Sequence, residues 1–461
     1  MVSVSQESKI ENWSSRFTFL MASIGFSVGL GNIWRFPYVA GENGGAAFII
    51  VYLACALCIG VPLVMSEWAI GRKAKNAASA VGSFKELAQN EGLTTKWSSV
   101  GGMGVIAVFM MMLTYTVITG WTLDYFSMAV MGEFTDVTPE KSATIFDGLM
   151  SDPLRLIFWH SVVVFITVFV NSKGVQGGIE KAVRILMPSL FICLLIMVAY
   201  SSVVGDMSAA LHFLLTPDFS LITGETFLLA LGQAFFSIGI AMAVMVTYGS
   251  YLDKGASIGQ NSFIVVFADT FVAMLAGFAI FPLVFAHGLT PDAGAGLVFR
   301  VLPVALGDLA GGQIFSAVFF LLLIAAALTS CIGNFEPIVA WTAERSKFSR
   351  QKATYLAGSV MWILGILSVL SLNILRDFHP FDFIHLLENK SIFGSLDYIS
   401  ASILLPIGGF FTAIFVGWKV SPKTMQAELN LSNRQFLLWQ CLIKFVAPLA
   451  IFVVFISGIM S

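Results

Sequence analysis

The chain has 461 residues, of which 57% are hydrophobic and 11% are charged, and its formal net charge is −2. Soluble domains carry about 25% charged residues, so a compact soluble globule of this composition would expose far too much apolar surface. The composition therefore excludes disordered, nucleic-acid-binding and ordinary cytosolic proteins, and it predicts that lipid surrounds most of the chain. The small net charge carries no information about an acidic or basic partner.

Eleven apolar stretches are long enough to cross a membrane, because a spanning helix needs about 20 mostly apolar residues. Strands are excluded because the apolar runs are too long and do not alternate. The first stretch has no signal-peptide cleavage pattern and contains Asn32 and Arg35, so we interpret it as a mature span. The expected spans are 15–40, 43–71, 98–130, 153–171, 179–203, 227–253, 260–287, 313–345, 351–374, 396–418 and 435–459.

Most of the 25 Lys and Arg residues fall in the loops that lie on the same side as the N-terminus. Cytoplasmic loops carry an excess of these residues, so the pattern predicts a cytoplasmic N-terminus. With an odd number of spans, the C-terminus is then expected outside.

Two of the expected spans are interrupted by glycine in mid-span, at 25–32 (GFSVGLGN) and at 236–243 (FSIGIAMA). Paired interruptions in corresponding spans are typical of transporters built from inverted repeats. We therefore expect a cytoplasmic segment 1–14, repeats at 15–203 and 227–418, and an additional span at 435–459. The alternative is that these glycines only allow close helix packing, but the Asn32 and Arg35 that follow the first interruption argue against it.

A helix interrupted within lipid frees backbone N–H and C=O groups, which then need partners. Half-helix N-termini favour a carboxylate, and freed carbonyls favour a cation. Asp269 lies in an apolar stretch where an ionisable residue is costly, which favours cation coordination over a structural hydrogen bond. The polar side chains near the interruptions are hard oxygen ligands suited to an alkali cation, namely Ser27, Asn32, Ser237, Asp269, Thr329 and Ser330.

The remaining ionisable residues in apolar surroundings have more ordinary interpretations. Glu67 and Glu336 are expected to bond backbone amides of a broken helix, and Asp124 is expected at the membrane interface. Arg35 and Asp397 are expected to pair across an external vestibule, unless they reach the membrane surface independently. The chain carries no zinc-protease, nucleophile-elbow or phosphate-loop motif, so we expect no enzyme.

Five segments resemble, in order and spacing, the neurotransmitter:sodium symporters. They are 25–48 (GFSVGLGNIWRFPYVAGENGGAAF), 62–72 (PLVMSEWAIGR), 232–252, 268–282 and 328–337. The resemblance implies an all-α polytopic membrane protein with the LeuT-like fold, eleven helices as in many bacterial members, and helices 1 and 6 unwound in mid-membrane. It also implies sodium-coupled uptake of a small molecule across a bacterial inner membrane by alternating access.

By the same resemblance, particular residues acquire roles. The first sodium site would use Ser27, Asn32, Ser237 and Asp269 together with a substrate carboxylate, and the second would use Gly25, Val28, Ala326, Thr329 and Ser330. Tyr115 and Phe236 would form a lid, with Arg35 and Asp397 outside it. Trp13, Tyr251 and Glu344 would form the inner gate, with Lys9 as the cation nearest to Glu344. The substrate site would comprise Phe26, Ser27, Gly29, Leu30, Gly31, Met111, Tyr115, Phe236, Ser237, Gly239, Met242, Ser330, Cys331 and Asn334.

The substrate class follows from departures within this resemblance. Amine-transporting relatives carry an Asp where this chain has Gly29, so the substrate must bring its own carboxylate, as an amino acid does. The pocket residues are mostly apolar, which favours hydrophobic or aromatic L-amino acids, although Cys331 and Asn334 would admit a polar substituent.

The ion requirement is inferred in the same way. Chloride-dependent relatives have an Asn at Asp269 and a Ser at Ala273, so we expect two sodium ions and no chloride requirement. Tyr52, Gln233 and Ser237 nevertheless match the chloride-site pattern. The alternatives are a proton- or chloride-coupled amine or osmolyte carrier, and a sensor that binds amino acids without transporting them. We expect no nucleic-acid partner, and the sequence does not determine the oligomeric state.

Overall fold

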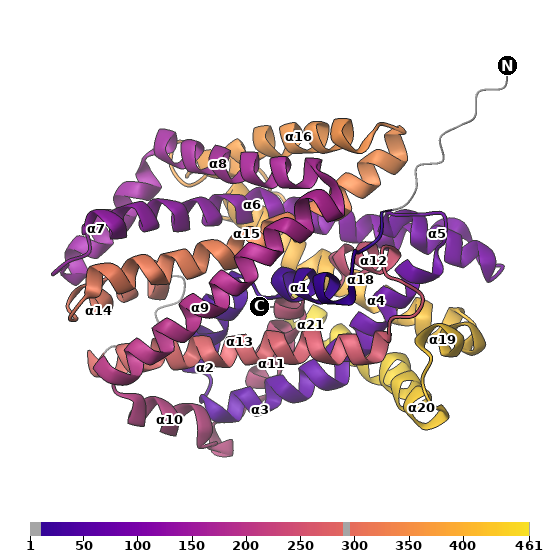
Figure 1. The fold of residues 1–461 in the computed structure, drawn as a ribbon, viewed down its shortest axis with the longest axis horizontal. Helices are drawn as coiled ribbons and strands as arrows, with labels where there is room; N and C mark the ends of the chain where they lie inside the picture. The colour runs from indigo at the N-terminus through magenta and orange to yellow at the C-terminus, as the bar shows by residue number, and fades with distance from the viewer. Residues whose placement is uncertain (1–10, 289–295, 461) are drawn as a thin grey trace.

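The computed structural model describes residues 11–288 and 296–460, and in these ranges it contains helices and no strand (Figure 1). Nine helical segments there are long and apolar enough to cross a membrane. They consist of α3 (Ala46–Cys55), η2 (Ala56–Gly60) and α4 (Val61–Lys73); η3 (Thr95–Trp97) and α6 (Ser98–Met131); α8 (Pro153–Ser172); η4 (Val175–Ile179) and α9 (Glu180–Val204); α13 (Ile258–Ala286); α15 (Gly312–Ser346); α16 (Arg350–Leu370); α17 (Ile392–Tyr398), η8 (Ile399–Leu404), α18 (Leu405–Ile414) and η9 (Phe415–Lys419); and α20 (Asn433–Cys441), η10 (Leu442–Val446) and α21 (Ala447–Met460).

Two further segments are broken helices. The first joins α1 (Arg16–Ser27) to η1 (Gly31–Arg35) and α2 (Phe36–Glu42) with a bend of 52°, and it passes as a tenth span if the pair is counted as one. The second consists of α11 (Gly224–Ile238) and α12 (Val244–Ser250), each too short to span a membrane alone. The mid-membrane breaks are thereby confirmed, whereas the total of eleven spans and the division into two repeats stay predictions.

Short helices connect these segments outside the expected membrane core. They are α5 (Ala80–Asn90), α7 (Pro139–Ser151), α10 (Met207–Leu215), η5 (Phe219–Leu221), η6 (Leu297–Val301), α14 (Leu302–Gly307), η7 (His385–Leu387) and α19 (Pro422–Leu429).

Local sequence explains where several helices begin. The Ser15 hydroxyl accepts a hydrogen bond from the Thr18 backbone N–H and caps α1. Asp152 caps α8, with Pro153 at the first helical position, where its missing N–H costs nothing. These caps satisfy backbone donors that the first turn of a helix would otherwise leave without partners.

The helices pack around α6 and α15, which run side by side through the middle of the bundle (Figure 1). Elsewhere in the bundle, α12 packs closely on α4 because a glycine on each helix lets the two backbones approach. A Cβ at Gly71 would lie 1.9 Å from the Val246 carbonyl oxygen, and one at Gly249 would lie 2.6 Å from the Trp68 carbonyl oxygen. The second half of the broken helix is therefore held against the α4 backbone.

Large apolar side chains point outward from the helices at the periphery. Phe165 is 68% exposed, Ile185 69% and Val203 83%. In water such a surface would be unfavourable, but in a bilayer it contacts lipid tails. Polar side chains gather instead in the interior, around the two breaks.

Candidate functional site

The first break leaves three residues outside regular helix. The helix α1 ends at Ser27 and helical structure resumes at Gly31, so the break is narrower than the expected 25–32. The Gly29 N–H donates to Asn32 Oδ1 at 3.1 Å, and the Leu30 N–H donates to the Tyr115 hydroxyl at 3.2 Å. The freed amides therefore face polar atoms at the centre of the bundle.

The second break has an unusual backbone. Gly239 follows α11 with φ +73°, and Ala241 and Ala243 also have positive φ values of 64° and 60°. The Ala241 N–H donates to Glu67 Oε1 at 2.7 Å, which is the scaffolding role expected for this acid. A side chain at Gly239 would not fit, because its Cβ would lie 2.3 Å from Cζ of Phe26.

A cluster of buried oxygen groups lies between the two breaks. The Asn32 amide nitrogen donates to Asp269 Oδ1 at 2.7 Å and to Ser237 Oγ at 3.0 Å. The Ser237 and Tyr52 hydroxyls donate to Asp269 Oδ2 at 2.7 and 3.2 Å. Because Asp269 and Asn32 are 0% exposed, a negative carboxylate here favours a cation bound beside it. The nearby Ser27 hydroxyl donates to the Ile238 carbonyl oxygen at 3.1 Å.

A second group of oxygen atoms lies where α1 meets α15. The Thr329 hydroxyl donates to the Ala326 carbonyl oxygen at 2.9 Å, and the Ser330 hydroxyl donates to the Phe26 carbonyl oxygen at 3.1 Å. A Cβ at Gly25 would lie 3.4 Å from Cβ of Thr329. The last turn of α1, which includes Gly25 and ends one residue before Val28, is thus brought against these hydroxyls. Neutral carbonyl and hydroxyl oxygens are a donor set that fits an alkali cation.

Beside the first cluster lies a central cavity of about 30 Å³. This volume holds roughly two water molecules. Two expected residues are not on its wall: Leu30 faces the site through its backbone N–H, and the Cys331 sulfur points to the Thr119 hydroxyl at 3.5 Å. The wall comprises Phe26, Ser27, Gly29, Gly31, Asn32, Met111, Tyr115, Phe236, Ser237, Gly239, Met242, Ser330 and Asn334.

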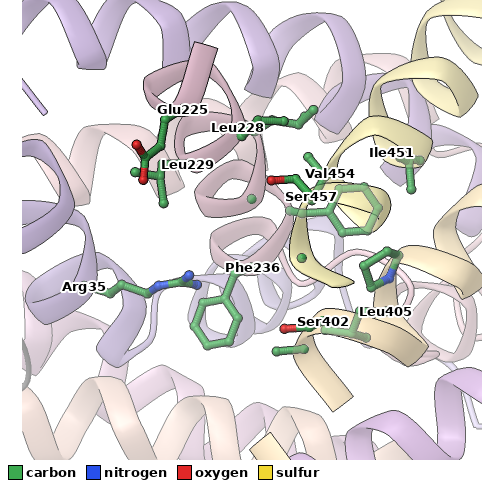
Figure 2. Close-up of a pocket in the computed structure, with 16 residues that line it drawn as sticks. Arg35, Glu225, Leu228, Leu229, Phe236, Ser402, Leu405, Ile451, Val454 and Ser457 are labelled. Carbon is green, nitrogen blue, oxygen red and sulfur yellow. The ribbon is translucent and has the colours of Figure 1, made fainter. Parts of the chain in front are cut away.

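A second cavity of about 380 Å³, which we call the outer cavity because Arg35 is expected to face the outside, lies between α11, η8, α18 and α21 (Figure 2). Phe236 lines both cavities. The Arg35 guanidinium carbon lies 4.8 Å from the centre of the Phe236 ring. Among the described residues, Arg35 and Asp397 make no direct ion pair, but their opposite charges attract each other at longer range, so the expected pairing across a vestibule stays a prediction.

The comparisons with known proteins agree with this geometry. The family model described as the sodium:neurotransmitter symporter family matches residues 10–141 and 149–461. The chain belongs to this family. The symporter is 34% identical to the uncharacterized sodium-dependent transporter YhdH of Bacillus subtilis, with 99% of both chains covered. It is 36% identical to an uncharacterized sodium-dependent transporter of Haemophilus influenzae, over 97% of this chain and 98% of that one.

The symporter is also similar to a solved structure, the crystal structure of MhsT in complex with L-phenylalanine. The two chains are 39% identical and superpose with a TM-score of 0.87, over 97% of this chain and 99% of that one. The expected LeuT-like fold is thereby confirmed. The protein is a multi-pass, sodium-coupled membrane transporter and not an enzyme.

At one end of the symporter, aromatic and charged side chains connect the segment before α1 to the helices. The Trp13 indole N–H donates to the Tyr248 carbonyl oxygen at 3.1 Å. The Tyr251 hydroxyl donates to Glu336 Oε1 at 2.8 Å, and Arg350 forms a two-pronged ion pair with the same carboxylate. Because Glu336 is 0% exposed, this pair holds α12, α15 and the start of α16 together.

The expected role of Glu344 in this gate stays a prediction. Glu344 is exposed, and its carboxylate accepts a hydrogen bond from the Ser79 N–H at 3.1 Å. Glu336 contacts Tyr251, and it bonds side chains rather than the backbone amides expected for it. The expected partner of Glu344, Lys9, lies outside the described residues.

The sequence did not indicate the ion pairs of Arg350 and Asp124, and the expected position of Asp124 at the membrane interface stays a prediction. Asp124 has a side chain that is only 2% exposed, and it accepts hydrogen bonds from Arg155 at 2.7 and 2.9 Å and from the Trp159 indole at 2.6 Å. The signal for both pairs was an acid and an arginine close in sequence but on different helices.

Proposed function

We propose that the symporter takes up L-amino acids with hydrophobic or aromatic side chains, together with two sodium ions. The observation that carries this proposal is the juxtaposition of three features at the breaks: backbone amides that bond side chains instead of helix carbonyls, the Asn32–Asp269 oxygen cluster and an adjoining apolar wall. A zwitterion with an apolar side chain matches all three.

The amino acid carboxylate would bind at the first break. The Leu30 N–H now donates to the Tyr115 hydroxyl oxygen at 3.2 Å, and a carboxylate bound between the two groups could accept a hydrogen bond from each of them. Gly29 adjoins them without a side chain, and a Cβ there would lie 2.6 Å from Ser330 Oγ and 2.9 Å from the Tyr115 hydroxyl oxygen. The chain thus supplies no carboxylate of its own at Gly29 that would attract an amine.

The substrate side chain would lie among Phe26, Met111, Phe236 and Met242, which are the large apolar members of the cavity wall. The cavity of about 30 Å³ is far smaller than an aromatic side chain, so these residues must move apart on binding. Methionine suits this role because its three rotatable bonds let it fill or vacate irregular space. The similarity to MhsT, whose crystal structure is a complex with L-phenylalanine, supports the same class.

The first sodium ion would bind among Ser27, Asn32, Ser237 and Asp269, and the second among Gly25, Val28, Ala326, Thr329 and Ser330. In the first site, Asp269 supplies the fixed negative charge, and Ala273, one turn along α13, is buried without a polar group. A chloride ion is therefore not needed for neutrality.

Sodium binding and substrate binding would be coupled because both use the substrate carboxylate. If the substrate carboxylate completes the first sodium site, each ligand raises the affinity of the other by the same factor. Each charge that moves inward gains about 2.3 kcal/mol per 100 mV of membrane potential. In the proposed cycle α1, α4, α11, α12 and α13 rock against α6, α8, α15 and α16. Phe236 then moves toward the outer cavity, and on the other side the bonds from Trp13 to Tyr248 and from Tyr251 to Glu336 break.

The test is uptake of radiolabelled amino acids by proteoliposomes that contain the purified symporter, with sodium, proton and chloride gradients imposed one at a time. We expect accumulation of hydrophobic and aromatic amino acids under the sodium gradient alone. Uptake of amines or osmolytes instead, or a requirement for chloride or protons, would support the alternative carrier. Binding without accumulation would support a sensor.

A further inference from the structure

The Asn334 side chain is an exception among the polar groups around the central cavity. It lies on the cavity wall, is 3% exposed, and its amide forms no hydrogen bond with any described residue. The other polar side chains of this wall all have partners; Ser330, for example, bonds the Phe26 carbonyl oxygen. Buried polar groups are almost always hydrogen-bonded, so an unpartnered amide beside a binding cavity points to the ligand as its partner.

The position of Asn334 along α15 indicates which part of a substrate it would meet. Ser330 and Asn334 are four residues apart on one helix face, so Asn334 lies about 6 Å further along the axis. Ser330 adjoins Gly29 and Tyr115, where the substrate carboxylate is proposed to bind. Asn334 therefore lies one helical turn away from the carboxylate, at the level of the substrate side chain.

The chemistry of the amide narrows the choice of side chain. An amide offers one acceptor and two donors, a phenol hydroxyl both donates and accepts, and an indole N–H donates. The surrounding wall is otherwise apolar, with Phe26, Met111 and Met242 among its members. A ligand that fits both properties has an aromatic ring with a polar hydrogen at its edge.

We propose that Asn334 makes the symporter select aromatic amino acids with a hydrogen-bonding ring, tyrosine and tryptophan, over phenylalanine. This inference rests on the proposed function, because it concerns the side chain of an amino acid bound in that site. Phenylalanine fills similar space but leaves the amide without a partner inside the protein. One net hydrogen bond to a buried amide corresponds to roughly tenfold in affinity.

The experiment compares inhibition constants of tyrosine, tryptophan and phenylalanine against sodium-driven uptake in proteoliposomes. We expect the wild-type symporter to bind tyrosine about tenfold more tightly than phenylalanine, and the Asn334→Leu variant to bind both equally. The Asn334→Thr variant keeps a smaller hydrogen-bonding group, so it serves if leucine disturbs folding and is expected to retain part of the preference. The Met111→Leu variant reshapes the same pocket without removing a polar group and should change both affinities by the same factor.

The outcomes separate the two proposals. A ratio of tyrosine to phenylalanine affinity that Asn334→Leu leaves unchanged, or a wild-type preference for phenylalanine, overturns the role of Asn334 while amino acid transport stands. Absence of sodium-driven uptake for all three amino acids overturns the proposed function, and the inference with it.

Discussion

Replacing Asp269 with asparagine tests the first sodium site most directly. The carboxylate is 0% exposed and accepts hydrogen bonds from Asn32, Ser237 and Tyr52 at 2.7, 2.7 and 3.2 Å. Asparagine has nearly the same shape but no charge. Two unit charges 4 Å apart attract by about 4 kcal/mol at an effective dielectric constant of 20. The cost of burying the carboxylate offsets part of this gain.

We therefore expect Asp269→Asn to lose about 1.4–2.8 kcal/mol of sodium binding, which is a 10- to 100-fold rise in the sodium concentration for half-maximal uptake. The assay is initial uptake rate against external sodium in proteoliposomes, measured with and without chloride. Asp377→Asn removes the same charge from an exposed position outside the site and serves as the control.

Restoration of the sodium response by chloride would support the view that Asp269 supplies the fixed negative charge of this site. An Asp269→Asn variant with the same sodium dependence as Asp377→Asn, and no response to chloride, would refute the assignment of Asp269 to a sodium site.

Three further substitutions test other parts of the structure. Gly29→Ala would place a methyl group 2.6 Å from Ser330 Oγ, so we expect at least tenfold weaker substrate inhibition of uptake, and unchanged inhibition would contradict the proposed carboxylate position. Glu336→Gln removes the buried acidic partner of Arg350 and leaves it the longer ion pair with Glu11 at 3.5 Å, at a cost of up to about 3 kcal/mol, whereas Glu344→Gln removes an exposed charge. We expect a lower Tm in detergent for Glu336→Gln only. Equal Tm values for the two variants would argue against the contacts described among Tyr251, Glu336 and Arg350. Gly71→Ala would put Cβ 1.9 Å from the Val246 carbonyl oxygen and should lower Tm, while Gly102→Ala, with nothing within 4 Å, should not; matching values would contradict the close packing of α4 and α12.

The membrane character and both helix breaks could be predicted from the sequence because their causes are local. Apolar length decides whether a segment crosses lipid, and glycine in mid-span weakens the helix that would otherwise continue. The residues at which each break begins and ends, however, depend on contacts with distant parts of the chain. Tyr115 on α6 bonds Leu30, and Glu67 on α4 bonds Ala241, so distant helices determine where each half-helix ends.

Some site residues could likewise be predicted from the sequence, and others needed the structure. By its own chemistry, the sequence marked Asn32, Ser237 and Asp269 as polar groups in lipid-buried segments, and the family resemblance supplied their grouping, so only their distances needed the structure. The sequence did not predict that Glu336 contacts Tyr251 and Arg350, because these contacts depend on which face of α15 meets the neighbouring helices.

By itself, the sequence determined that lipid surrounds most of this protein, where its helices break and which residue types could hold an ion. It could do so because hydropathy and backbone preference act over a few residues. Only the tertiary structure decided which side chains meet across helices and which buried group, such as Asn334, is left without a partner. Hydrogen bonds and ion pairs form over about 3 Å, and only packing brings residues that are far apart in the chain within that range.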